Sequence, residues 1–387
     1  MSTVEEKQDF KIELAQKIFL LKNESIKGID RSKLSKEILD TIEEKDLAPI
    51  YEYVCQHLGW TKDEAKLTTM RQKNEVMLKE LEAKISDAEN NMGEQEVRDA
   101  LLAKAEFLTQ LGDKESATKA FEATESKTSG VGNKMDLVFS QIRLLMFYED
   151  WRGVKKLLAK AKLLCDQGGD WERKNKLKVY DAVFATYTRD FKTSANLFLE
   201  ALATFTASEL FPYQRVIFYA VISAMVSYDR VALKKCVVDA PEVLTAIGQL
   251  PQLELFLNSL YNCKYKEFFR AFVEVVDQMR ADPYLSPHIK YYMRELRAVA
   301  YAQFLESYKS VTIDSMASAF DISPAFLDEE VADFIVAGRL NAKIDKVAGI
   351  IETNRPDNKN ALYQDTIKKG DALLNRIQKL SKVIDME

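Results

Sequence analysis

A turn that recurs every 37 to 40 residues constrains the fold of this chain more than any other feature. Asp113, Asp150, Asp190 and Asp229 mark it, at separations of 37, 40 and 39 residues. Positions four and eight after the first three turns carry small, aliphatic or aromatic side chains: Ala117, Phe121, Val154, Leu158, Ser194 and Phe198. This period is typical of tetratricopeptide-like solenoids, whose stacked helical hairpins bury one continuous core. We therefore expect a right-handed solenoid of such hairpins over residues 97–285.

The composition agrees with an all-α fold, because Gly (13) and Pro (8) are scarce and helix interiors tolerate neither. The net charge of −5 argues against a general affinity for phosphate backbones. The four cysteines form no C-x-x-C pair and only two histidines occur, so we expect no metal, no cofactor and no catalytic centre. The charged N-terminus indicates no secretory signal, and the apolar run from Val216 is too short to span a bilayer.

Two segments precede the repeats. Residues 1–66 carry short amphipathic helical segments. Residues 67–96 predict a long, highly charged helix with a narrow apolar face, whose members alternate in steps of three and four: Leu67, Met70, Asn74, Met77, Leu81, Ile85, Ala88 and Met92. Two interpretations stand for this helix. It packs against neighbours in the same chain, which we favour, or it forms a coiled coil with another protein.

Residues 286–355 predict a winged-helix module that begins with one long helix. A β-branched stretch begins at Val311, and Asp314 is expected to cap the short helix that follows. Ser323 is expected to cap a second helix that ends at Gly338. The apolar positions expected to be buried in this second helix are Phe326, Leu327, Val331, Phe334 and Ile335. The segments LNAKID and GIIET alternate in polarity and predict the two strands of a short β-wing.

A helix–turn–helix with a wing suggests DNA binding, but the second helix has the wrong charge for it. It carries four acidic residues and no basic one, namely Asp328, Glu329, Glu330 and Asp333. A helix that reads a DNA groove presents Arg, Lys, Asn or Gln to bases and phosphates. We therefore expect a protein partner rather than nucleic acid. The basic residues Arg339, Lys343 and Lys346 leave nucleic-acid binding through the wing as an alternative.

The final segment, residues 356–387, predicts one amphipathic helix with an apolar face at 4-3-4 spacing. We expect it to join a bundle with helices of other subunits, although docking on its own winged helix is the alternative interpretation. The wing offers a second candidate surface, a sheet edge available to a neighbour. The candidate interface residues on the two surfaces are Leu340, Lys343, Ile344, Ile350, Ile351, Leu373, Leu374, Ile377, Leu380 and Ile384.

Five long stretches carry a resemblance to a known family. They are AGRLNAKIDKVAGIIETNRPDNKN from Ala337, IKKGDALLNRIQKLS from Ile367, GGDWERKNKLKVY from Gly168, SLYNCKYKEFF from Ser259 and LAKAEFLTQLGDKE from Leu102. The chain closely resembles the non-ATPase subunit 6 family of the 26S proteasome regulatory particle. The resemblance covers most of the chain from about residue 45 onward and includes the PCI domain, a winged-helix module of large scaffold complexes.

The resemblance implies a non-catalytic subunit of the regulatory-particle lid. Winged helices of such subunits pack side by side in an arc, their C-terminal helices gather in a bundle, and the deubiquitinase activity lies in a different subunit. It implies other lid subunits as partners, with the proteasomal ATPase base as a further candidate, and a role in ATP-dependent degradation of ubiquitinated proteins in the cytoplasm and nucleus, with no membrane association. A PCI scaffold of a signalosome or translation-initiation-factor complex would share this architecture, so it stays as an alternative.

Overall fold

The computed structural model describes residues 8–23, 26, 30–91, 93–354 and 358–384. It confirms an all-α fold with a short β-wing. The chain divides into two compact units, and the division falls between Met293 and Arg294. None of the helices in the described part combines the length and the apolar character that crossing a membrane requires.

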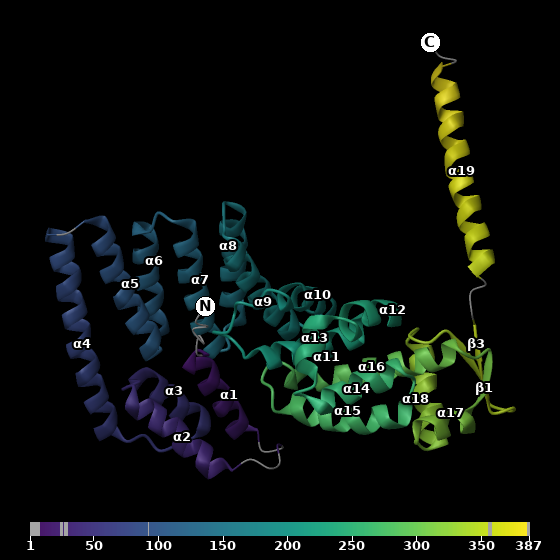
Figure 1. The fold of residues 1–387 in the computed structure, drawn as a ribbon, viewed down its shortest axis with the longest axis horizontal. Coiled ribbons are helices and arrows are strands. Elements are labelled where there is room, and N and C mark those ends of the chain that lie inside the picture. The colour runs from purple at the N-terminus through teal and green to yellow at the C-terminus, as the bar shows by residue number, and fades with distance from the viewer. Residues whose placement is uncertain (1–7, 24–25, 27–29, 92, 355–357, 385–387) are drawn as a thin grey trace. The chain divides into compact units, whose positions relative to one another are not determined.

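The first unit is a succession of helices (Figure 1). Its elements are α1 (Phe10–Lys22), α2 (Arg31–Glu44), α3 (Ala48–Leu58), α4 (Glu64–Asn91), α5 (Glu94–Leu111), α6 (Lys114–Lys127), α7 (Val131–Phe147), α8 (Trp151–Asp166), α9 (Trp171–Tyr187), α10 (Phe191–Leu202), α11 (Tyr213–Ser227), α12 (Arg230–Leu233), the π-helical turn η1 (Lys234–Val238), α13 (Pro241–Ile247), α14 (Pro251–Tyr261), α15 (Tyr265–Arg280) and the 3-10 turn η2 (Ser286–His288). Figure 1 shows α4 to α8 side by side, each packed against the next.

The repeated aspartates form the turns of helical hairpins, as the sequence predicts. The side chains of Asp113, Asp150 and Asp190 each accept a hydrogen bond from the backbone N–H three residues on, at 3.0 to 3.2 Å. Each therefore caps the second helix of its hairpin. The residue before each aspartate lies in the left-handed region, where it reverses the chain: Gly112 (φ 83°), Glu149 (φ 55°) and Arg189 (φ 67°).

The fourth turn departs from this pattern. Asp229 precedes α12 without a side-chain cap, and α12 spans only four residues before the π-helical turn η1. The regular turn returns at Lys264, which follows Cys263 in the left-handed region (φ 60°) and precedes α15. The hairpin pattern is therefore interrupted between α11 and α14.

The core follows the small and aromatic positions of the repeat. All six positions expected from the sequence are buried, and Ala117, Phe121, Ser194 and Phe198 have no exposed surface. Phe198 stacks on Tyr219 of α11 with ring centroids 5.8 Å apart, which joins adjacent hairpins. This arrangement makes each hairpin depend on its neighbours, as in other solenoids.

The long helix α4 packs within its own chain, against α3 and α5. Leu67 and Met70 are buried in the cluster formed by α1 to α3. Further along, Leu78 rather than Met77 packs against the apolar cluster of α5, α6 and α7, and Met77 is exposed. The inner face of α4 thus differs from the predicted one at this position, whereas Leu81, Ile85 and Ala88 lie on it as expected. Met92 lies outside the described residues. This packing supports the favoured interpretation of an internal helix.

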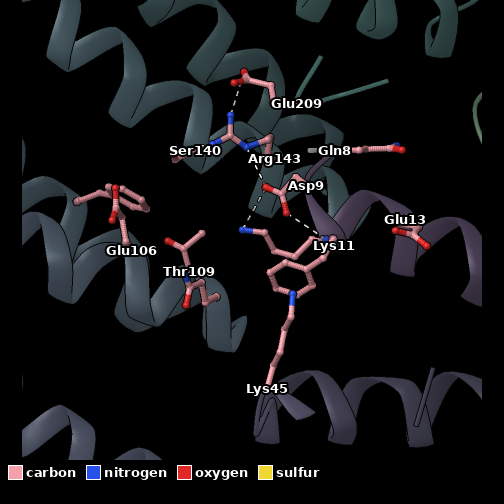
Figure 2. A pocket seen from close by; sticks show the side chains of 13 residues that line it. Gln8, Asp9, Lys11, Glu13, Lys45, Glu106, Thr109, Ser140, Arg143 and Glu209 are labelled. Atoms are coloured by element: carbon pink, nitrogen blue, oxygen red, sulfur yellow. Dashed lines mark hydrogen bonds and ion pairs between the residues drawn. The ribbon is translucent and has the colours of Figure 1, made fainter. Parts of the chain in front are cut away.

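The first helix is held to the solenoid by a partly buried polar network, shown in Figure 2. The Asp9 carboxylate lies between Lys11 (3.6 Å) and the Arg143 guanidinium (3.0 Å). Arg143 also pairs with Glu209 at 3.0 Å, and the Asp9 backbone N–H donates to the Glu209 carbonyl oxygen at 2.9 Å. These residues line a cavity of about 650 Å³. Burial lowers the pKa of Lys11, and the nearby Asp9 opposes that shift.

We expect His288 to make stability fall at low pH. Its Nε2–H donates to the Tyr187 carbonyl oxygen at 2.7 Å, and its Nδ1 accepts from Arg189 at 3.3 Å. Burial lowers the pKa of His288, so below pH ~6.5 the unfolded chain takes up a proton that the folded chain does not. The free energy of unfolding should therefore decrease as the pH drops from 7.5 to 5, and less so in His288→Gln, as measured by urea denaturation. A stability difference between the two proteins that is independent of pH would contradict this assignment.

Candidate protein–protein interface

The winged helix and the last helix contain all the residues expected at an interface. Their elements are α16 (Ile289–Glu306), β1 (Ser310–Thr312), α17 (Ile313–Phe320), α18 (Pro324–Val336), β2 (Ala342–Asp345), β3 (Ile350–Thr353) and α19 (Asn358–Ile384). Helices α17 and α18 form the helix–turn–helix, and Asp321 in the left-handed region (φ 62°) makes the turn between them.

A side-chain cap from the local sequence marks the start of both α17 and α18. The cap of α18 is the expected residue, and the cap of α17 is a different one. The Ser323 side chain accepts from the Phe326 backbone N–H, and Gly338 (φ 69°) follows the end of α18, as predicted. The cap of α17 is Thr312 rather than Asp314, because the Thr312 hydroxyl accepts from the Ser315 N–H at 3.3 Å. Asp314 lies in the first turn of α17 instead, where a negative charge still favours the helix dipole.

The core of the winged helix is built from aromatic contacts between α16, α17 and α18. Tyr301 meets Phe320 edge to face at 5.0 Å, and Phe304 meets the same ring at 5.4 Å. Of the five apolar positions expected to be buried in α18, Leu327, Val331 and Phe334 are buried and Ile335 is partly buried. The expectation for Phe326 is wrong, because it lies in the first turn on the outer side and is exposed.

The wing is part of a three-stranded antiparallel sheet of order β1-β3-β2. The β-branched stretch at Val311 supplies the third strand, and Val311 pairs with Ile351, as does Ile344 from the other side. Strand β3 is therefore central, and the outer edge of the wing belongs to β2. This position excludes β3 as the edge that a neighbouring chain could extend.

The candidate wing residues divide accordingly. Leu340 and Ile351 are buried in the module itself, with Ile351 fully inaccessible. Ile344 and Ile350 are partly buried, and Lys343 on the edge strand is exposed. Lys343, with the outward backbone groups of β2, is the part of this set that a partner can reach.

Two acidic side chains of α18 form ion pairs with basic residues of the same module. The Glu330 carboxylate faces inward and accepts from Arg297 (2.6 Å) and from the Tyr301 hydroxyl (2.7 Å). On the wing, Lys346 lies 3.4 Å from Asp328 of α18. Burial raises the pKa of the Tyr301 hydroxyl, as does its bond to Glu330, so this hydroxyl stays protonated as a donor. The outer side of α18 keeps exposed acidic groups and no basic one.

The last helix exposes its apolar face. Leu373, Leu374, Ile377 and Leu380, here called the apolar seam, are between 52% and 61% exposed. Every side chain described between Leu362 and Ser381 is exposed as well. Ile384 ends α19, and its side chain lies outside the described ones. An uncovered run of large apolar side chains on a helix of this length is a typical site for a partner helix.

Several other exposed apolar residues of the winged helix were missed by sequence reasoning, among them Phe326, Val336 and Val347. Val336 sits in the last turn of α18, and Val347 is in the turn between β2 and β3. Helical periodicity does not separate Val336 from the buried positions around it, so the sequence held no clear signal. Among the residues that the structure describes, no group of three or more His, Cys, Asp or Glu side chains could hold a metal ion.

Three family models match the chain. The model of the 26S proteasome subunit RPN7 matches residues 63–236, and that of the PCI domain matches residues 273–355. The model of the RPN7/PSMD6 C-terminal helix of the 26S proteasome regulatory subunit matches residues 363–384. The last two matches cover the winged helix and the apolar seam.

Curated relatives are similar over nearly their whole length. The chain is 53% identical over 373 residues to the 26S proteasome non-ATPase regulatory subunit 6 homolog of Arabidopsis thaliana, covering 96% of both chains. It is 44% identical to the 26S proteasome non-ATPase regulatory subunit 6 of Dictyostelium discoideum, covering 96% of this chain and 97% of the relative. The 26S proteasome regulatory subunit RPN7 of Saccharomyces cerevisiae is 36% identical, with 96% and 92% covered.

Proposed function

The chain belongs to the family of 26S proteasome non-ATPase regulatory subunit 6, or RPN7, and on this premise we propose that it is a non-catalytic structural subunit of the lid of the 19S regulatory particle. In that role it supports assembly of the particle and, through it, the ATP-dependent degradation of ubiquitinated proteins. Its place of action is the cytoplasm and nucleus. The resemblance that the motifs predicted is confirmed by the family membership.

The exposed apolar seam of α19 is the observation that carries the proposal. Burying a leucine or isoleucine side chain contributes about 1.5–3 kcal/mol, so four such residues on one helix are a large unused source of binding energy. A partner helix covers such a face in a bundle. The exposure of the seam in the isolated chain therefore favours the bundle interpretation over docking on the winged helix of the same chain.

The wing supplies the second proposed contact. Strand β2 is an edge strand with an exposed lysine, and such an edge can pair with another chain through its backbone groups. We assign residues 286–355 to side-by-side contacts with the winged helices of other lid subunits. Residues 356–387 are assigned to the bundle, and the ATPase base is a further candidate partner.

Deletion of residues 368–387 tests this proposal. We expect the shortened protein to keep the thermal stability of the full chain, because the described side chains that it loses are exposed. It should fail to co-purify with other lid subunits when it replaces the full chain in cells, as measured by affinity purification and mass spectrometry. Normal incorporation into the lid would contradict the bundle role, and co-purification of the full chain with signalosome or initiation-factor subunits would contradict the proposed function.

A further inference from the structure

A cavity of about 310 Å³ lies beside the turn between α7 and α8. Its walls come from α1, α3, that turn, the end of α9 and the loop before α16. Aromatic side chains dominate the lining, among them Tyr53, Trp151, Tyr187 and Tyr284. Trp151 stacks on Tyr187 with ring centroids 4.0 Å apart, and Tyr284 meets Trp151 edge to face at 5.8 Å. The proposed assembly role makes no use of this cavity.

One carboxylate accompanies the rings. Glu149 is the left-handed residue of the α7–α8 turn, is exposed, and lines the cavity. Burial raises the pKa of Tyr53 to about 12, and the charge of Glu149 adds to the shift. Burial also raises the pKa of Tyr284, with Glu149 again contributing. Glu149 thus lines the same cavity as both phenol rings, and the described residues provide no ion-pair partner for its carboxylate within 4.0 Å.

Aromatic faces and a carboxylate together favour a cation. A guanidinium group stacks on aromatic rings and forms charge-assisted hydrogen bonds with a carboxylate, which an ammonium group does less well. Ligand pockets span about 300 to 1,000 Å³, so this cavity of about 310 Å³ lies at the small end of the range and has room for one amino-acid side chain. We propose that this cavity binds the side chain of an arginine presented by a partner protein, with Glu149 as its counter-ion and Trp151 and Tyr187 among its aromatic walls.

The chain has one cation of its own at the cavity. Lys22, in the last turn of α1, is the one lysine or arginine among the lining residues and is exposed. Among the described residues, no carboxylate lies within 4.0 Å of the Lys22 ammonium group. Lys22 therefore does not form an ion pair with Glu149, and the Glu149 carboxylate can pair with an external cation. Removing Lys22 should strengthen binding of an external cation slightly, because it removes a like charge.

Saturation-transfer NMR with the full-length chain tests the site. The probe is Nα-acetyl-arginine amide, and Nα-acetyl-citrulline amide is its neutral isostere. We expect the arginine probe to bind with a dissociation constant on the order of millimolar, and the citrulline probe about tenfold more weakly, because it lacks the charge. Glu149→Gln should weaken binding of the arginine probe about tenfold, whereas Glu122→Gln, an exposed substitution on α6, should leave it unchanged.

Lys22→Ala serves as a second variant and should bind the arginine probe at least as tightly as the original chain. The proposal is overturned if the arginine probe shows no saturable signal with either the original chain or Lys22→Ala. It is equally overturned if citrulline matches arginine, or if Glu149→Gln and Glu122→Gln behave alike. These results do not depend on assembly into a lid, so they separate this site from the proposed function.

Discussion

Replacing Arg215 by alanine is expected to lower the free energy of unfolding by about 3 to 5 kcal/mol. Arg215 of α11 lies 2.8 Å from the Asp282 carboxylate and donates to the Tyr219 hydroxyl at 3.0 Å. It also donates to the side chain of Gln16 in α1. Asp282 is buried, so removing the guanidinium leaves a negative charge in the interior without its cation. Urea denaturation followed by circular dichroism measures the loss.

The interior around this pair explains why the effect should be large. Burial alone would lower the pKa of Arg215, but the facing Tyr219 and Asp282 outweigh it and raise the pKa, so the guanidinium stays charged. Asp282 also accepts from the backbone N–H groups of Tyr284 and Leu285, at 2.9 and 3.2 Å. The pair thus joins α1, α11 and the loop after α15 at one point.

An exposed arginine provides the matched control. Arg280 pairs with Asp277 at 2.7 Å on the surface of α15, and pairs of this kind contribute about 0–1 kcal/mol. Arg280→Ala should therefore have little effect. A loss below about 1 kcal/mol in Arg215→Ala, or an equal loss in both variants, would contradict the structural role given to the buried pair.

The hairpins could be predicted from the sequence because their determinants are local. A capping aspartate accepts from the N–H three residues on, and the residues four and eight positions after it are buried in each of the three regular units. The same local logic placed Ser323 and Gly338 correctly in the winged helix. It failed at Asp314, because Thr312 two residues earlier offers an equally good oxygen.

What the sequence could not supply depends on residues distant along the chain. Asp9 and Arg143 are 134 residues apart, and no pattern in either segment indicates that they meet. The central position of β3 follows from pairing with β1, and a three-residue strand gives too weak a signal to predict its partner. As a result, Ile351 looked like an interface residue and proved to be core. The apolar seam was predictable as a pattern, but its exposure was not.

Introducing two charges into the apolar seam is expected to abolish assembly while leaving the fold unchanged. In Leu373→Asp with Ile377→Asp, both side chains are exposed, so the free energy of unfolding should change by less than about 1 kcal/mol, mostly from the lower helix propensity of aspartate. In a bundle, the same carboxylates would be buried against apolar neighbours at a cost of at least about 3 kcal/mol. That cost corresponds to more than ~100-fold in the association constant, measured by co-purification and by binding of recombinant lid subunits.

The opposite side of α19 supplies the matched control. Ala372→Asp with Asn375→Asp adds the same charge to the same helix, and at about 100° per residue these exposed positions lie about 80° or more away from all four residues of the seam. If the seam binds a partner helix, this control assembles normally and the seam variant does not. Equal loss in both would mean that overall charge or helix stability governs assembly, and normal assembly of both would place the bundle contact elsewhere. Because the two variants differ only in the face that they alter, the comparison ties the effect to the seam itself.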